Sequence, residues 1–241
     1  MIEKPLEVIP LASGLANDVL LLKGQHQSYI FKWLRHSDAL GLDRNDEYCL
    51  QSLLAQAGLA PEVIALDPGR WVLQQYISGN SLADISYSHE KKLRYTARAL
   101  ALIHRQQPAW QGTDLWQKLA KYVARLGAKE QLQLACFRND LKTTEQPVLC
   151  HFDLSFGHII VQDTIRIIDW EYAGWGDPLT DIASAAEINQ LDESSVEALC
   201  WYYSAETGLV FDKQRFELNR FFIRWINRQW QQLLQQEVSH E

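Results

Sequence analysis

The stretch 147–177, PVLCHFDLSFGHIIVQDTIRIIDWEYAGWGD, decides the prediction of the fold and of the chemistry. Its apolar runs HIIV and TIRII predict two short strands joined by a turn at Gln162-Asp163-Thr164. Asp153 precedes the first strand and Asp169 directly follows the second, and a tight hairpin brings these two ends together. We therefore expect the two carboxylates to lie close to one another. Such a pair suits a proton acceptor beside a ligand of a divalent cation, although loop aspartates also commonly serve as turn and cap residues.

The composition of the chain is that of a globular protein. Its 241 residues are 47% hydrophobic and 22% charged, and the formal net charge is −7. An acidic balance argues against a protein whose main task is to bind nucleic acid, because phosphate contacts need a basic surface. The four cysteines form no Cys-x-x-Cys pair, so we expect reduced thiols rather than a disulfide or zinc framework.

The compartment is predicted from what the sequence lacks. The N-terminus has no apolar run of the signal-peptide kind, and no apolar run reaches the ~20 residues of a membrane span. We expect a cytoplasmic protein that is not embedded in a membrane.

Two domains are predicted from a change of periodicity near residue 78. Before it, strand-like runs and one amphipathic helical run alternate, at 7–11, 18–22, 29–34, 44–57 (the helix), 61–67 and 70–77. After it, helical patterns dominate, at 89–107, 115–126 and 215–236, interrupted by the hairpin described above. The prediction is an α+β protein with a small sheet-bearing domain (1–78) and a larger, mainly helical domain (79–241), with the default ligand site between them.

The ordered spacing also resembles a known family. HFDLSFGHIIV and IRIIDWEYAGWGDPLTDIA resemble the patterns H-x-D-x-x-x-x-N, I-D-W-E-x-A and D-P-x-x-D-x-A of the aminoglycoside phosphotransferase and choline kinase superfamily. The DWEYAG run and the aromatic, Gln-rich last helix are most similar to the bacterial thiamine kinases. The resemblance implies a two-lobed, protein-kinase-like fold and transfer of the γ-phosphoryl group of ATP to a hydroxyl of a cationic metabolite. Thiamine is the acceptor preferred by the resemblance, with choline or an aminoglycoside as the alternative.

The resemblance assigns roles within the quoted stretch. Asp153 takes the place of the catalytic base and Asp169 that of the principal Mg²⁺ ligand. His158 stands where the family carries asparagine, so it is either a second metal ligand or a brace for the loop of Asp153. Mg²⁺ prefers oxygen ligands, and an imidazole there favours Mn²⁺. His158 also leaves open a protein of another class, one that binds a nucleotide or metabolite without phosphotransfer.

The nucleotide site is expected mainly in the first domain. Gly14 and Asn17 belong to the short loop that resembles the family's phosphate loop, and Gly14 would permit a close backbone approach. Lys32 matches the lysine that contacts phosphates, with Glu47 as its expected ion-pair partner and Asp46 as a competitor. The backbone around Gln75–Ile77 matches the hinge that meets adenine.

The acceptor side is predicted from aromatic and acidic residues. A cationic acceptor is bound by aromatic faces and carboxylates, and the chain has nine tryptophans. Tyr172 and Trp175, in the loop after Asp169, are the candidates for the pocket, whereas Glu171 either caps that turn or faces the substrate. The aromatic residues of the last helix recur near helical spacing, which favours core packing: Phe221, Phe222, Trp225 and Trp230. His151, Asp177 and Asp181 are expected to support the loops.

Overall fold

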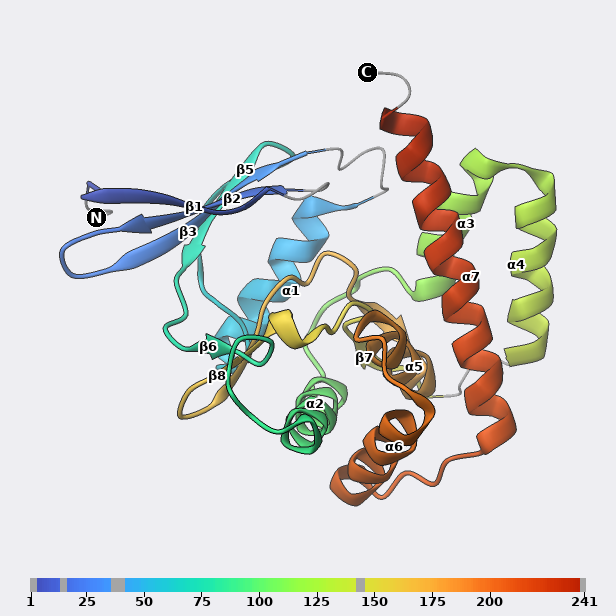
Figure 1. The fold of residues 1–241 in the computed structure, drawn as a ribbon. Coiled ribbons are helices and arrows are strands. Elements are labelled where there is room, and N and C mark those ends of the chain that lie inside the picture. Colours follow the sequence, from blue (N-terminus) through green and yellow to red (C-terminus); the bar gives the residue numbers. More distant parts are fainter. Residues whose placement is uncertain (1–3, 14–16, 36–41, 142–145, 239–241) are drawn as a thin grey trace.

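The structure is a computed structural model that describes residues 4–13, 17–35, 42–141 and 146–238. Gly14 lies outside these residues. Two lobes are visible in Figure 1, a sheet with one helix and a mainly helical lobe. The expected α+β, two-lobed architecture is confirmed.

The first lobe is built on a five-stranded antiparallel sheet of order β1-β2-β3-β5-β4. Its elements are β1 (Glu7–Ser13), β2 (Asn17–Lys23), β3 (Ser28–Leu34), α1 (Arg44–Gln56), β4 (Val63–Asp67) and β5 (Trp71–Gln75). Gly69 closes the β4–β5 hairpin with a φ of 78°, a conformation that favours glycine. The Asp43 carboxylate caps α1 by accepting the Asp46 amide proton, and Gly58, with a φ of 74°, follows its end. The predicted strands and helix of this lobe are therefore present.

The second lobe consists of helices around short strands. The helices are α2 (His89–His104), α3 (Leu115–Leu126), α4 (Ala128–Leu141), α5 (Pro178–Ile188), α6 (Glu193–Thr207) and α7 (Lys213–Val238). The short elements are β6 (Asn80–Ser81), β7 (Val148–Cys150), the single-turn helix Phe156–His158, β8 (Ile159–Val161), β9 (Ile165–Ile167) and β10 (Gly174–Gly176). Among the helices of the described ranges, none is long and apolar enough to cross a membrane.

The hairpin predicted inside the quoted stretch is present as β8 and β9. Ile159 pairs with Ile167 and Val161 with Ile165, and β6 adds a third strand on the far side of β8. Ile159 and Ile167 are fully buried, which fixes the register of the hairpin on the core. The loop before β8 and the residues after β9 therefore meet at one end, as the sequence predicts.

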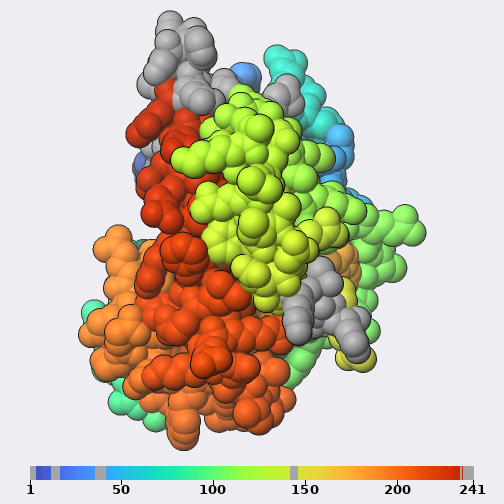
Figure 2. All heavy atoms as spheres, turned by 90° about the vertical axis from the view of Figure 1, so that its right-hand side faces the viewer, coloured from blue at the N-terminus to red at the C-terminus, as the bar shows by residue number. Residues whose placement is uncertain are grey.

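Two hydrophobic cores hold the helical lobe together. The larger one lies among α2, α5, α6 and β7, and includes Leu100, Leu149 and Ile182. The smaller one lies among α3, α4 and α7, where Phe137 packs against Phe222 and Trp225. Figure 2 shows α4 and α7 side by side on the face turned away from the sheet.

The prediction of core packing for the aromatic residues of α7 is confirmed for two of the four. Phe222 and Trp225 are buried, whereas Phe221 is 50% exposed. Trp230 differs, because it lines the cavity between the lobes and donates its indole N–H to the Tyr172 hydroxyl at 3.0 Å.

Candidate active site

A cavity of about 840 Å³ lies between the sheet and the helical lobe. The sheet side contributes Asn17, Lys32 and the segment Gln75–Ile77, and the helical side contributes residues from the hairpin, α3 and α7. The cavity therefore collects most of the residues that the sequence singled out, from positions far apart in the chain.

The loop that carries Asp153 has a strained backbone held by α5. Phe152 has a φ of 59°, a left-handed conformation that is rare for a bulky residue. Its amide donates to Asp181 Oδ1 at 2.7 Å, and its carbonyl accepts from Ser184 Oγ at 2.6 Å. Because both backbone groups of Phe152 are bound by α5, the neighbouring Asp153 is held in one direction.

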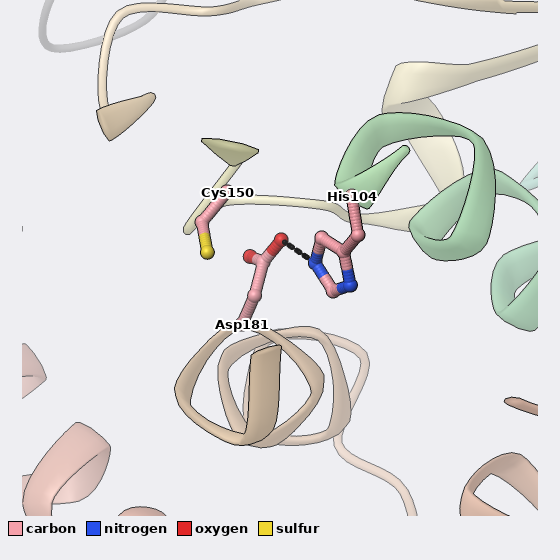
Figure 3. A group of neighbouring side chains, drawn as sticks. All are labelled: His104, Cys150 and Asp181. Atoms are coloured by element: carbon pink, nitrogen blue, oxygen red, sulfur yellow. Dashed lines mark hydrogen bonds and ion pairs between the residues drawn. The ribbon is translucent and has the colours of Figure 1, made fainter. Parts of the chain in front are cut away.

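Asp181 also binds the amide of His151 in this loop and a ring nitrogen of His104, and Figure 3 shows the contact with His104. Its Oδ2 accepts the His151 amide proton at 2.9 Å and lies 3.0 Å from His104 Nε2. The other ring nitrogen of His104 lies 2.6 Å from the Tyr203 hydroxyl. Burial raises the pKa of Asp181, but the hydrogen bonds from His104 and the His151 amide outweigh it and the pKa lies below its usual range.

His104, Asp181 and Cys150 form a buried group whose ligand atoms lie within 4.8 Å of one another, close enough in principle for a metal ion (Figure 3). Both Asp181 oxygens already accept hydrogen bonds, and Cys150 Sγ points at backbone carbonyls. The arrangement fits a hydrogen-bonded anchor for the loop, as expected for Asp181.

His151 is buried and structural. Its Nε2 donates to the Ile168 carbonyl at 3.1 Å, its Nδ1 accepts the Asp153 amide proton at 3.3 Å, and its ring packs on Trp170. Burial lowers the pKa of His151 to about 4, so the ring is neutral near pH 7. Through these two hydrogen bonds, His151 connects the loop before β8 with the segment after β9.

Asp153 and Asp169 lie on either side of His158. His158 Nδ1 donates to the Asp153 carbonyl at 2.6 Å and lies 3.7 Å from Asp153 Oδ2. Its Nε2 lies 3.6 Å from Asp169 Oδ2. The bracing contact that the sequence left open is therefore present, and it fixes which nitrogen faces Asp169.

The pKa values of the Asp153 and Asp169 carboxyl groups are shifted in opposite directions. Burial, followed by the charges of Asp169 and Glu171, raises the pKa of Asp153 well above its usual value. Burial also raises the pKa of Asp169, but the ammonium group of Lys32, whose Nζ lies 2.7 Å from Asp169 Oδ1, outweighs it and the pKa falls well below its usual range. One carboxylate is suited to accepting a proton and the other to staying ionised.

The donor set around His158 fits a divalent cation. Asp169 offers a carboxylate oxygen, and His158, which donates through Nδ1, presents its Nε2 toward Asp169. Oxygen with one imidazole nitrogen is a set that Mn²⁺ accepts readily and Mg²⁺ less so.

The expected ion pair between Lys32 and Glu47 is wrong as a direct contact. Lys32 binds Asp169, and Glu47 Oε2 instead accepts from Arg44 Nη1 at 2.7 Å. Asp46 does not compete for Lys32, because it accepts the indole N–H of Trp110 at 2.7 Å. Arg44 was missed by the sequence reasoning, although its spacing of three residues from Glu47 on a helix was a usable signal.

The segment after β5 lines the cavity as expected, with one restriction. Gln75, Tyr76 and Ile77 all contribute to the lining. The amide of Gln75 donates to the Glu62 carbonyl at 2.8 Å and that of Tyr76 to the Ser28 carbonyl at 3.2 Å. These two amides serve the sheet and are not available to a nucleotide.

The end of the cavity beside α3 and α7 is aromatic. Tyr172 lines it, as predicted, together with Tyr122 of α3 and Trp230 of α7, which the sequence did not identify as pocket residues. Trp175 was predicted here wrongly. It belongs to β10, where it pairs with Leu149, and its ring packs on Trp110 outside the cavity lining.

Two charged residues complete this end. Glu171 is buried, and its Oε2 accepts from Arg44 Nη1 at 2.9 Å and from Asn17 Nδ2 at 3.2 Å. Lys118 of α3 donates to the Ala173 carbonyl, and burial lowers its pKa to about 8. Glu171 therefore lines the cavity, which agrees with the second of its two predicted roles, that of facing the substrate. Its Oε2 is already bound by Arg44 and Asn17.

The chain is similar to known phosphotransferases over most of its length. The model of the phosphotransferase enzyme family matches residues 7–218. The protein LicA of Haemophilus influenzae is 24% identical over 227 residues, which cover 87% of this chain and 67% of that protein. The chain spans about two thirds of the length of the LicA relatives, or slightly less.

Solved structures of similar fold include the choline kinase LicA of Streptococcus pneumoniae, with a TM-score of 0.75 and 20% identity over 97% of this chain and 86% of the other. A structure of LicA in complex with AMP has a TM-score of 0.73 and 21% identity over 97% and 85% of the two chains. The resemblance to the superfamily is confirmed, whereas the likeness to thiamine kinases stays a prediction. With its fold, its paired aspartates and this match, the chain belongs to the phosphotransferase enzyme family.

Proposed function

We propose that the protein transfers the γ-phosphoryl group of ATP to a hydroxyl group of a small cationic metabolite. The observation that carries the proposal is the meeting of Asp153, Asp169 and Lys32 in one cavity between the lobes. Phosphoryl transfer depends on positioning and on neutralising the charge of the phosphates, and these three residues supply a proton acceptor, an ionised carboxylate and a cation.

The roles follow from the chemistry of each group. Asp153 would accept the proton of the acceptor hydroxyl as its oxygen attacks the γ-phosphorus and the bond to the β-phosphate oxygen breaks, which leaves ADP. Lys32 would orient the phosphates from the sheet side. Asn17 and the segment Gln75–Ile77 would line the nucleotide site. Asp169 and His158 would hold Mg²⁺ or Mn²⁺, which when bound neutralises the phosphate oxygens.

The division of the chain at residue 78 belongs to the same proposal. Asn17, Lys32 and the segment up to Ile77 come from the first domain (1–78), whereas both aspartates and the acceptor end come from the second (79–241). In this view the nucleotide binds mainly to the first domain and the acceptor mainly to the second.

The acceptor is proposed to be cationic because aromatic faces line its end of the cavity. Tyr122, Tyr172 and Trp230 offer π surfaces for a cation, and the charge of Lys118 is directed at the Ala173 carbonyl. Thiamine is supported by the DWEYAG run and the last helix, and choline by the match to a choline kinase fold. We place thiamine first and choline second.

A phosphotransfer screen tests the proposal. The protein with ATP and either Mg²⁺ or Mn²⁺ is incubated with thiamine, choline, ethanolamine, homoserine and aminoglycosides, and phosphorylated product is detected by mass spectrometry. We expect product with thiamine or choline. Tight ATP binding without transfer to any acceptor of the panel would contradict the proposal and support a protein that only binds a nucleotide.

A further inference from the structure

Arg44 occupies a position that its own helix does not favour. It is the first residue of α1, where the positive end of the helix dipole disfavours a cation, and its side chain is only 3% exposed. Burying a guanidinium group costs free energy unless it is paired and hydrogen-bonded. The reason for its placement must therefore lie in its partners.

Three elements meet at this guanidinium group. Nη1 donates to Glu47 Oε2 of α1 at 2.7 Å and to Glu171 Oε2, after β9, at 2.9 Å. Nη2 donates to Asn17 Oδ1, at the start of β2, at 3.1 Å. Asn17 closes the ring by donating from Nδ2 to the same Glu171 oxygen at 3.2 Å. Arg44 thus connects two elements of the sheet lobe with a segment of the helical lobe.

The connection acts close to the reacting groups. Glu171 lies two residues after Asp169, whose backbone has a φ of 69°, and the Ala173 amide in the same turn donates to the Trp170 carbonyl at 3.0 Å. Lys32 contacts Asp169 from the sheet lobe as well. The backbone around Asp169 is therefore held from the sheet lobe on both sides, by Lys32 and by Arg44.

The buried charges of Glu47 and Glu171 depend on the contact with Arg44. The pKa of Glu47 is raised to about 7 by burial, and Arg44 is the largest influence that opposes this rise. Without Arg44, two buried carboxylates, Glu47 and Glu171, would face one another with no cation between them. The pKa of Glu47 would then rise further, so that it takes up a proton, and the hydrogen bonds through which Arg44 ties α1 to the segment after β9 would be lost.

We propose that Arg44 is a positioning residue: its bonds to Glu47, Asn17 and Glu171 fix the segment 169–173 against α1 and thereby set the place of Asp169 relative to Lys32. The inference rests on the proposed function for its effect on turnover, but its structural component stands independently. It deepens the proposed function by naming the device that joins the lobes at the site.

Hydrogen exchange of the protein without nucleotide or acceptor tests the structural component. Arg44→Met keeps the aliphatic stem and removes the charge. We expect about tenfold faster exchange in a peptide spanning 169–174, which lies in the other lobe. Glu171→Gln gives the reciprocal readout, with faster exchange at the first turn of α1, where the Glu47 amide donates to the Asp43 carbonyl. Arg70→Met is the matched control, because the pair that Arg70 makes with Asp67 is exposed to solvent.

Kinetics separate positioning from plain stability. In the folded variants we expect kcat/KM for ATP to fall about tenfold for Arg44→Met, less for Arg44→Lys, and no further when Glu171→Gln is added to Arg44→Met. A variant that only loses stability would keep the parent's kcat/KM in its folded fraction. If Arg44 and Glu171 acted independently on kcat/KM, their two losses would multiply in the double variant.

The outcomes are distinct. Unchanged exchange in 169–174 in folded Arg44→Met, or multiplicative losses in the double variant, would overturn the inference. If Arg44→Met fails to fold, Glu171→Gln decides: unchanged exchange at the first turn of α1 would overturn the inference, and faster exchange there would support it. Because exchange needs no turnover, failure of the acceptor screen affects the proposed function and not this result.

Discussion

Lys32 Nζ lies 2.7 Å from Asp169 Oδ1, so an ammonium group on β3 contacts the carboxylate that follows β9 across the cavity. Both side chains are largely shielded from water, at 8% and 25% exposure. The contact takes the place of the expected pair between Lys32 and Glu47. It keeps Asp169 ionised and places the lysine beside the proposed metal ligand.

Replacing Lys32 by methionine should weaken nucleotide use. The variant keeps the aliphatic length but removes the cation that we assign to the phosphates, so kcat/KM for ATP should fall at least about tenfold. Lys23→Met is the control, since Lys23 is exposed and its pair with Glu7 lies at the surface. Equal kcat/KM values for the Lys32 variant and the parent, measured by a coupled ADP assay, would remove Lys32 from the nucleotide site.

Replacing His158 by asparagine should change the metal preference. Nε2 of His158 lies 3.6 Å from Asp169 Oδ2, and an amide oxygen in its place suits Mg²⁺ better than an imidazole nitrogen does. We expect the ratio of Mn²⁺- to Mg²⁺-supported activity to be above one in the parent and to fall in the variant. His89→Asn, on a histidine outside the cavity lining, should leave the ratio unchanged. A ratio that stays constant in His158→Asn would leave only the bracing role.

Replacing Asp181 by asparagine should destabilise the loop of Asp153. Asparagine has one acceptor oxygen and would leave one of the two amides of His151 and Phe152 without a partner, at a cost of about 1–3 kcal/mol. Tm should fall by roughly 2–4 °C per kcal/mol for a chain of this size, and kcat should fall with it. Asp163→Asn, in the exposed turn of the hairpin, is the control. Calorimetry that finds the same Tm for the Asp181 variant and the parent would refute its role as an anchor.

Glu47 should make stability depend on pH. Its pKa is raised by burial from 4.5 in the unfolded chain to about 7 in the folded protein, so the folded protein binds more protons between these values. The contribution of Glu47 to stability is then largest below pH 4.5 and is lost as the pH rises through 7, by on the order of 1–3 kcal/mol. Glu47→Gln should remove this contribution to the fall, so that Tm differs less between about pH 5 and pH 8 than in the parent. Asp153 contributes a fall of the same sign, which the variant leaves in place. An unchanged pH dependence of Tm in Glu47→Gln would contradict the raised pKa of the buried Glu47 carboxyl.

Local patterns accounted for much of the fold. The strands and helix of the first lobe follow from periodicity and turn residues, and the hairpin that brings Asp153 near Asp169 lies within one short stretch. Helix α4 was not predicted, because its apolar residues do not gather on one distinct face.

The rest of the site depends on contacts between distant segments. Lys32 and Asp169 are 137 positions apart, and Arg44 and Glu171 are 127 apart, so no spacing in the sequence relates them. Trp175 was misplaced because its two flanking glycines indicated a loop, whereas Gly174 and Gly176 pair with β7. The prediction that the pocket is aromatic rests instead on Tyr172 together with Tyr122 and Trp230, which come from separate helices.

The most direct test of the central claim, that Asp153 is the proton acceptor in phosphoryl transfer, is single-turnover transfer from γ-labelled ATP to the acceptor found by the screen. Asp153→Asn keeps the shape of the side chain and removes the proton acceptor. We predict that transfer slows by ~10²-fold or more while ATP affinity, measured by calorimetry, changes little. Transfer at nearly the parent's rate in this variant would contradict the account.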